Sequence, residues 1–81
     1  MPLMSAEQIE ALNQIIQMID QQSNKYKNEL MKMPEFKRKA EKKLLLDLIQ
    51  NGIKLAGDIK PKPLEAIGDL TRLSEQIERL G

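Results

Sequence analysis

Residues 34–57 read PEFKRKAEKKLLLDLIQNGIKLAG and change in character halfway along. With about 100° of rotation per residue, as in an α-helix, the apolar side chains of the second half share one broad arc. These are Leu44, Leu45, Leu46, Leu48, Ile49, Ile53, Leu55 and Ala56. In the first two turns the same arc carries Arg38, Glu41 and Lys42. The segment is therefore predicted to form one helix with an apolar C-terminal half and a charged N-terminal half.

The preceding segment has the pattern of a long amphipathic helix. Its apolar residues recur at alternating spacings of three and four, interrupted at Ser23. They are Ile9, Leu12, Ile16, Ile19, Tyr26, Leu30 and Met33. With Ser5 as the N-terminal cap, we expect a helix over residues 6–32. A break at Ser23 and Asn24, which both favour caps, is the alternative.

Two local signals decide where these helices end. Pro34 disfavours helical conformation at Met33, so we expect the chain to reverse there; a bent, continuous helix is the alternative. Asn51–Gly52 indicates a hairpin when alternating segments flank it, but the leucine-rich flank here does not alternate. The second helix is therefore predicted over residues 35–56, with Gly57 as its stop.

A third helix is predicted over residues 64–80, after a stiff connector that ends in Pro63. Its apolar stripe consists of Ile67, Leu70, Leu73, Ile77 and Leu80. Short connectors place successive helices antiparallel. The predicted fold class is thus all-α, a three-helix antiparallel up-down-up bundle with a long first helix, in a single domain of residues 1–81.

The size of the chain predicts self-association. A chain of 81 residues buries only roughly 60 to 65% of its unfolded surface, so it usually needs a further source of stability. The sequence has no cysteine, which excludes disulfides, and packing into a homo-oligomeric helical bundle is the source that remains. The predicted interface residues come from the apolar faces of the first two helices: Ile9, Leu12, Ile15, Ile16, Ile19, Tyr26, Leu45, Ile49 and Ile53.

Residue types argue against catalysis. Without histidine or cysteine, the common nucleophiles, bases and soft-metal ligands are missing, and no glycine-rich phosphate loop is present. We expect no enzymatic activity, no cofactor and no metal site. No apolar run approaches the ~20 residues of a membrane span, and Met1–Ser5 lacks the pattern of a secretory signal, so a cytoplasmic protein is expected.

Charge is distributed unevenly along the chain. Residues 1–24 carry −3, residues 25–43 carry +5, and residues 44–81 carry −1. In an up-down-up bundle, the end of the first helix and the start of the second meet at one end, which we call the cationic end. The candidate anion-binding residues there are Lys32, Lys37, Arg38, Lys39, Lys42 and Lys43, with Phe36 beside them.

The third helix is expected to stop short of the cationic end and to leave Arg38 and Lys42 uncovered. These two residues form a like-charge i,i+4 pair that costs roughly 0.2–0.5 kcal/mol. Three interpretations remain open. The cationic end is a solvated surface, a site for phosphate or carboxylate groups, or a contact with acidic residues of a second copy, such as Glu75 or Glu78.

These features favour a small, non-enzymatic, self-associating protein–protein interaction module. It would act as an adaptor or inhibitor of a partner protein, including one with an acidic surface. The alternative is an anion-binding protein that holds a nucleotide, a cyclic nucleotide or nucleic-acid phosphate at the cationic end. Neither hypothesis requires a membrane span.

Overall fold

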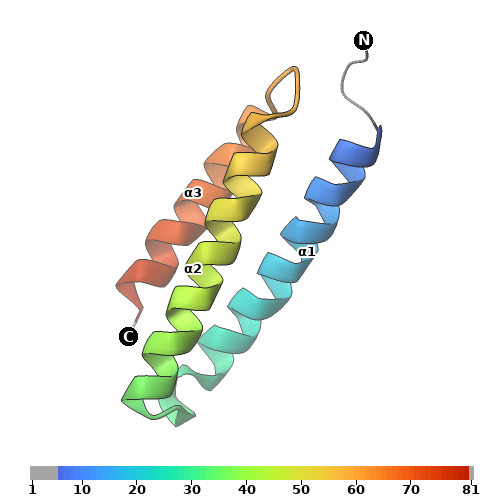
Figure 1. Cartoon of the computed structure of the whole chain (residues 1–81). Coiled ribbons are helices and arrows are strands. Elements are labelled where there is room, and N and C mark those ends of the chain that lie inside the picture. Colours follow the sequence, from blue (N-terminus) through green and yellow to red (C-terminus); the bar gives the residue numbers. More distant parts are fainter. Residues whose placement is uncertain (1–5, 81) are drawn as a thin grey trace.

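The computed structural model describes residues 6–80 of the chain. It contains three α-helices and one short 3₁₀ helix: α1 (Ala6–Glu29), η1 (Leu30–Lys32), α2 (Glu35–Gly57) and α3 (Leu64–Arg79). The three α-helices lie side by side, each antiparallel to the next: in the view of Figure 1, α1 runs down, α2 in the middle runs up and α3 runs down. The prediction of an all-α, three-helix bundle is confirmed.

The first reversal follows from the conformation that proline imposes. α1 runs unbroken through Ser23 and Asn24 and then tightens into η1. Met33 is extended, with φ −88° and ψ 138°, as expected for a residue before proline. Pro34 caps α2, and its carbonyl accepts a hydrogen bond from the Arg38 N–H at 2.9 Å. The chain reverses here, and the predicted cap at Ser5 lies outside the described residues.

α2 continues through Asn51–Gly52 because the glycine is buried between its two neighbouring helices. A Cβ atom at Gly52 would lie 3.2 Å from Ile19 Cδ1, 3.3 Å from Ile15 Cγ2 and 3.3 Å from Leu70 Cδ1. The missing side chain therefore lets α1 and α3 approach α2 closely at this level. Burial of the flanking leucine-rich segment overrides the hairpin tendency of the dipeptide.

The second reversal differs from the predicted one. Gly57 is the last helical residue of α2, and its φ does not lie in the left-handed region that a glycine stop adopts. The helix ends in a tight turn, in which the Asp58 N–H donates to the Leu55 carbonyl at 3.1 Å. The prediction that Gly57 lies beyond the helix as its stop is wrong. Ile59 folds back into the core at 3% exposure and so anchors the connector beside α2.

The core is built from the predicted apolar faces. Ile19, Ile49 and Ile77, one from each helix, are completely buried. The main cluster of buried residues is Ile19, Tyr26, Leu45, Ile49, Leu70 and Ile77, and a smaller cluster of Leu12, Ala56 and Ile59 lies toward the second reversal. Each helix therefore contributes its predicted apolar face to an interior within one chain.

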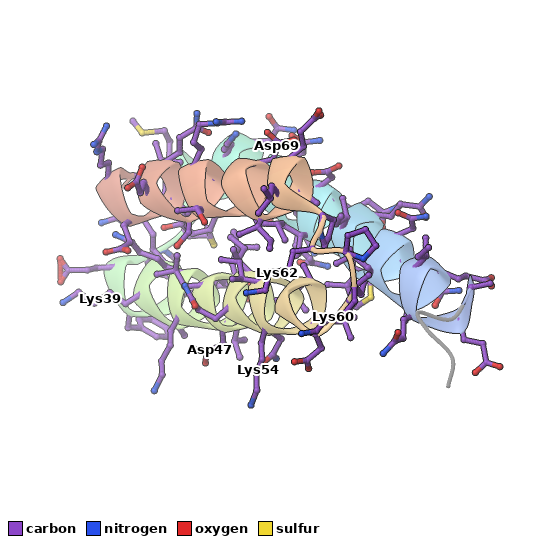
Figure 2. All side chains as sticks on the ribbon, turned by 90° about the horizontal axis from the view of Figure 1, so that it is seen from above. Lys39, Asp47, Lys54, Lys60, Lys62 and Asp69 are labelled. Atoms are coloured by element: carbon purple, nitrogen blue, oxygen red, sulfur yellow. The ribbon has the colours of Figure 1, made fainter. Side chains whose placement is uncertain are left out.

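The outer surface carries many charged side chains. Lys39, Asp47 and Lys54 project from α2 away from the other two helices in Figure 2. Within residues 6–80, no helix combines the length and apolar character that crossing a membrane requires. The described helices therefore bury their apolar faces against one another and present charge to solvent.

Candidate functional site

Part of the cationic end is exposed as predicted. Lys32, Lys37, Lys39 and Lys43 are exposed, and Lys39 lies 4.0 Å from the equally exposed carboxylate of Glu35. Such an exposed i,i+4 pair contributes only about 0.3–0.5 kcal/mol. These ammonium groups remain accessible to an anion in solution.

The aromatic residue beside these lysines is also exposed. Phe36 keeps 77% of its surface accessible. Its ring is therefore free to contact a ligand or another protein.

Lys42 has a different position from the one expected. Its Nζ atom donates hydrogen bonds to the carbonyl oxygens of Glu78, at 2.6 Å, and Leu80, at 3.0 Å. The prediction that the third helix stops short of this lysine is wrong, because α3 extends to its level along α2. A cation at the last carbonyls of a helix is favourable, since those groups have no partner in the helix and carry its partial negative charge. Lys42 therefore stabilises the packing of α3 on α2 and is not free to bind an anion.

Arg38 and Tyr26 lie at the same end of the bundle interior. Arg38 is half-buried, and its Nε atom and the Tyr26 hydroxyl are inaccessible and have no hydrogen-bond partner among residues 6–80. Burial raises the pKa of Tyr26, and the nearby Arg38 charge partly opposes this shift. Arg38 is therefore less available to a ligand than the four exposed lysines.

The predicted interface residues are largely used within the chain. Leu12, Ile19, Tyr26, Leu45 and Ile49 each retain at most 5% exposure. Of the remaining predicted interface residues, Ile15, Ile16 and Ile53 are half-buried against the core, and Ile9 is 42% exposed. Since most of the apolar seam of α1 is covered within the chain, copies of a closed bundle would meet mainly through other residues.

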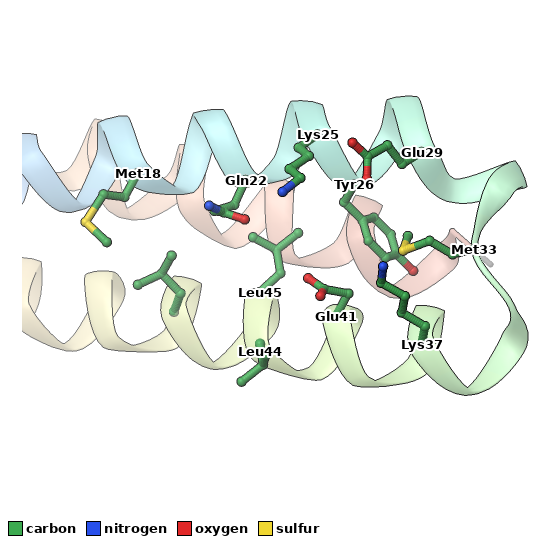
Figure 3. A pocket seen from close by; sticks show the side chains of 11 residues that line it. Met18, Gln22, Lys25, Tyr26, Glu29, Met33, Lys37, Glu41, Leu44 and Leu45 are labelled. Atoms are coloured by element: carbon green, nitrogen blue, oxygen red, sulfur yellow. The ribbon is translucent and has the colours of Figure 1, made fainter.

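Those other residues surround a groove between α1 and α2, with a volume of about 350 Å³. Its sides come from positions that flank the buried seam on both helices, and Tyr26, Leu45 and Met33 also line it. The side residues are Met18, Gln22, Lys25 and Glu29 on α1 and Lys37, Glu41, Leu44 and Leu48 on α2. We call this feature the α1/α2 groove (Figure 3).

The residues that line the two sides of the α1/α2 groove lie level with each other in four rows. Because the helices are antiparallel and both advance by four, three and four residues, each side chain on α1 has a counterpart on α2. Figure 3 shows three of these rows: Gln22 with Leu44, Lys25 with Glu41, and Glu29 with Lys37. The fourth row follows from helical periodicity, because Met18 lies four residues before Gln22 and Leu48 four residues after Leu44. The groove thus has an apolar half and a charged half.

The charged groups of the groove form no ion pair within residues 6–80, and two of its apolar side chains are exposed. Met18 and Leu44 are 51% and 65% exposed, although they lie beside the apolar floor. Among residues 6–80, no ion pair within 4.0 Å links Lys25 to Glu41 across the groove, and ion pairs are limited to Lys39 with Glu35 and Arg72 with Asp69. Both apolar surface and charge therefore remain available to another molecule.

A second hollow, of about 480 Å³, lies between α1 and α3. It is lined by Ile16, Asp20, Pro63, Glu65, Ala66, Asp69, Leu70 and Leu73. One of its three carboxylates, Asp69, already pairs with Arg72. In the described part of the chain, no three acidic side chains come together as a metal site would require.

The sequence contained a partial signal for the α1/α2 groove. Met18 lies outside the apolar seam of the first helix, and Leu44 is the first residue of a leucine run that is wider than one buried face. The matching rows required the register of the hairpin, which only the structure supplies. Comparisons with protein-family models, characterised proteins and solved structures each give no match for this chain.

Proposed function

We propose that this protein is a non-enzymatic helical interaction module that binds another protein through the α1/α2 groove. The observation that carries the proposal is the exposure of Met18 and Leu44 at 51% and 65%, beside an apolar floor. Covering the exposed part of each side chain would contribute roughly 1–2 kcal/mol. A groove between two helices with an apolar floor and charged margins suits an amphipathic helix of a partner.

The mode of action follows from the kind of surface involved. The chain offers neither histidine nor cysteine for chemistry, whereas the groove offers apolar area and charge for recognition. The protein would act as an adaptor or inhibitor by covering part of its partner's surface. Specificity would come from the charged half of the groove and affinity from its apolar half.

Site-specific photo-crosslinking in the native host would test this proposal. A benzophenone amino acid at position 44 lies in the groove, whereas one at position 31 lies outside it, where Met31 is 91% exposed. We expect discrete protein adducts from position 44 and none of comparable yield from position 31. Equal, diffuse labelling from both positions would contradict a binding role for the groove.

Anion binding at the cationic end is a second candidate function. It is favoured by four exposed lysines near the start of α2, which has no side-chain cap at Pro34. The first N–H groups of a helix attract anions, and the lysines would add to this attraction. The four lysines are Lys32, Lys37, Lys39 and Lys43.

Charge neutralisation away from the folding contacts would test the second candidate. We would measure binding of cyclic nucleotides and of a single-stranded oligonucleotide at increasing salt, for the wild type and for a variant in which Lys32, Lys39 and Lys43 are replaced by Gln. Salt-sensitive binding that the variant loses would support the site. Unchanged binding would eliminate it. Lys42 and Arg38 are left intact because they lie within the bundle.

A further inference from the structure

We propose that the occupant of the α1/α2 groove is the same groove of a second copy, related by a two-fold axis that runs along the groove. α1 and α2 of both copies would then form a four-helix core, with each α3 on the outside. This inference rests on the proposed function: it keeps the α1/α2 groove as a protein-binding site and names a second copy, in place of a different protein, as what the groove binds. It is carried by the order of charged and apolar residues along the groove.

The charged rows are complementary under this symmetry. A two-fold axis parallel to the helices preserves their levels and places α1 of one copy opposite α2 of the other. Lys25 then faces Glu41 of the second copy, and Glu29 faces Lys37 of the second copy. Each contact occurs twice, so four ion pairs form across the interface.

The same charges are poorly matched within one helix. Lys25 and Glu29 are four residues apart on α1, and Lys37 and Glu41 are four residues apart on α2. In both cases the lysine precedes the glutamate, which is the weaker order for an i,i+4 pair. None of these four residues takes part in an ion pair within 4.0 Å among residues 6–80. A second copy supplies the opposite charge at the correct level.

The apolar rows match under the same operation. Met18 faces Leu48 of the second copy, and Leu44 faces Gln22 of the second copy, whose methylene groups cover it. Contact between the two faces would remove Met18 and Leu44 from water, and these are the two large exposed apolar side chains of the groove. One symmetry operation therefore pairs the charges and buries the apolar surface.

A two-fold axis across the groove would not achieve this. It would reverse the order of the rows and place α1 against α1. Met18 would then face Glu29 of the second copy, and Leu48 would face Lys37 of the second copy. Burying these charges against apolar side chains is unfavourable, because the charges lose water without gaining a partner. The order of the four rows therefore favours the two-fold axis that runs along the groove.

The face is large enough for a stable dimer. The 24 residues of α1 span ~36 Å, and two helices packed ~8–10 Å apart present a face about 20 Å wide. The product is roughly 700 Å² per copy, close to the ~800 Å² of a standard interface. Beyond the groove, the half-buried residues Ala11, Ile15 and Leu55 continue the same face by helical periodicity.

Mixing two charge-reversed variants would test the symmetry. In a dimer of Lys25→Glu, the new glutamate at position 25 would face Glu41 of the other copy. In a dimer of Glu41→Lys, Lys25 would face the new lysine at position 41 of the other copy. Each variant alone therefore places like charges together, whereas a mixed dimer pairs all four positions with opposite charges. Lys25 is exposed and Glu41 is half-buried, and circular dichroism would verify that both variants fold.

The readout is mass by sedimentation velocity and native mass spectrometry at ~10–100 µM. We expect a wild-type dimer, dissociation constants about 10- to 100-fold higher for each variant alone, and a heterodimer in the equimolar mixture. A monomeric wild type, or variants that fail to form a heterodimer, would overturn the proposal. If the protein is monomeric but position 44 still crosslinks to another protein, the proposed function stands and only the second copy is excluded.

Cysteine crosslinking gives an independent readout if a charge variant fails to fold. The chain contains no cysteine, so Gln22→Cys and Leu44→Cys introduce single thiols. On mild oxidation of the mixture, we expect a disulfide between position 22 of one copy and position 44 of the other. Preferential crosslinking of position 22 to itself would contradict the axis along the groove.

Discussion

Replacing Lys42 by Met would show how strongly this lysine links α2 to the end of α3. The wild-type Nζ atom donates hydrogen bonds of 2.6 Å to the Glu78 carbonyl and 3.0 Å to the Leu80 carbonyl. Methionine keeps most of the apolar stem and removes the charge and its donors. Lys43→Met is the matched control, because Lys43 lies on the same helix and is exposed.

The expected loss can be worked from these contacts. A hydrogen bond to a charged group contributes about 1.5–3 kcal/mol when buried, and the helix dipole adds about 0.3–1 kcal/mol. One of the two bonds is exposed and the other only partly buried, so we expect a net loss of about 1–2 kcal/mol. For a domain of this size, that corresponds to a fall in Tm of roughly 5–15 °C.

Urea unfolding followed by circular dichroism would measure the effect. Variant and control must be compared at one low protein concentration, because association adds to the apparent stability. With an m-value of about 1 kcal/mol per M, the midpoint should fall by roughly 1–2 M for Lys42→Met and remain nearly unchanged for Lys43→Met. Equal midpoints for the two variants would refute the assignment of Lys42 to the fold.

Four further substitutions probe the interior and the helices. Gly68→Ala should raise the free energy of unfolding by about 0.8–1 kcal/mol, because alanine favours the helix and the new Cβ has only Arg72 Nη1 nearby, at 3.9 Å. Gly52→Ala, whose Cβ would press against core side chains, should gain less in the same urea experiment. Ser23→Ala should raise the unfolding midpoint by the equivalent of about 1 kcal/mol, because it removes a buried hydroxyl that has no hydrogen-bond partner among residues 6–80; a lower midpoint would indicate that this hydroxyl is satisfied. Burial raises the folded-state pKa of Tyr26 above its usual value of 10.0, so the folded state holds the phenol proton more tightly than the unfolded state does. The free energy of unfolding of the wild type should therefore fall as pH rises above 10. The stability of Tyr26→Phe relative to wild type should therefore improve as pH rises past 10, and a pH-independent difference would contradict the shift.

The helices and the core were predictable because they depend on local periodicity. The spacing of three and four residues identifies the face of α1 that holds Ile19, and the middle of the α2 arc, around Ile49, is buried as expected, whereas Leu44 at its edge is exposed. The turn at Pro34 was equally predictable, since it depends on the conformations that proline permits. Such signals lie within a few residues of each other along the chain.

The position of Lys42 was not predicted because it depends on how far α3 slides along α2. The 23 residues of α2 span ~34 Å and the 16 residues of α3 span ~24 Å, so α3 falls short by about 10 Å. That distance is about seven residues, which brings the end of α3 level with Lys42. Ile59 anchors the connector in the core and fixes this level. The α1/α2 groove depends in the same way on the relative level of two helices.

Gly52 sets the distance of α1 and α3 from α2 at one level of the bundle. It occupies the level at which Ile15 and Ile19 of α1 and Leu70 of α3 come nearest to α2, with only 3.2–3.3 Å available to a Cβ atom. A larger residue at this position would push α1 and α3 away from α2 together. The width of the two surface hollows would then change without any substitution on the surface, so the proposed binding would be adjustable from a single interior position.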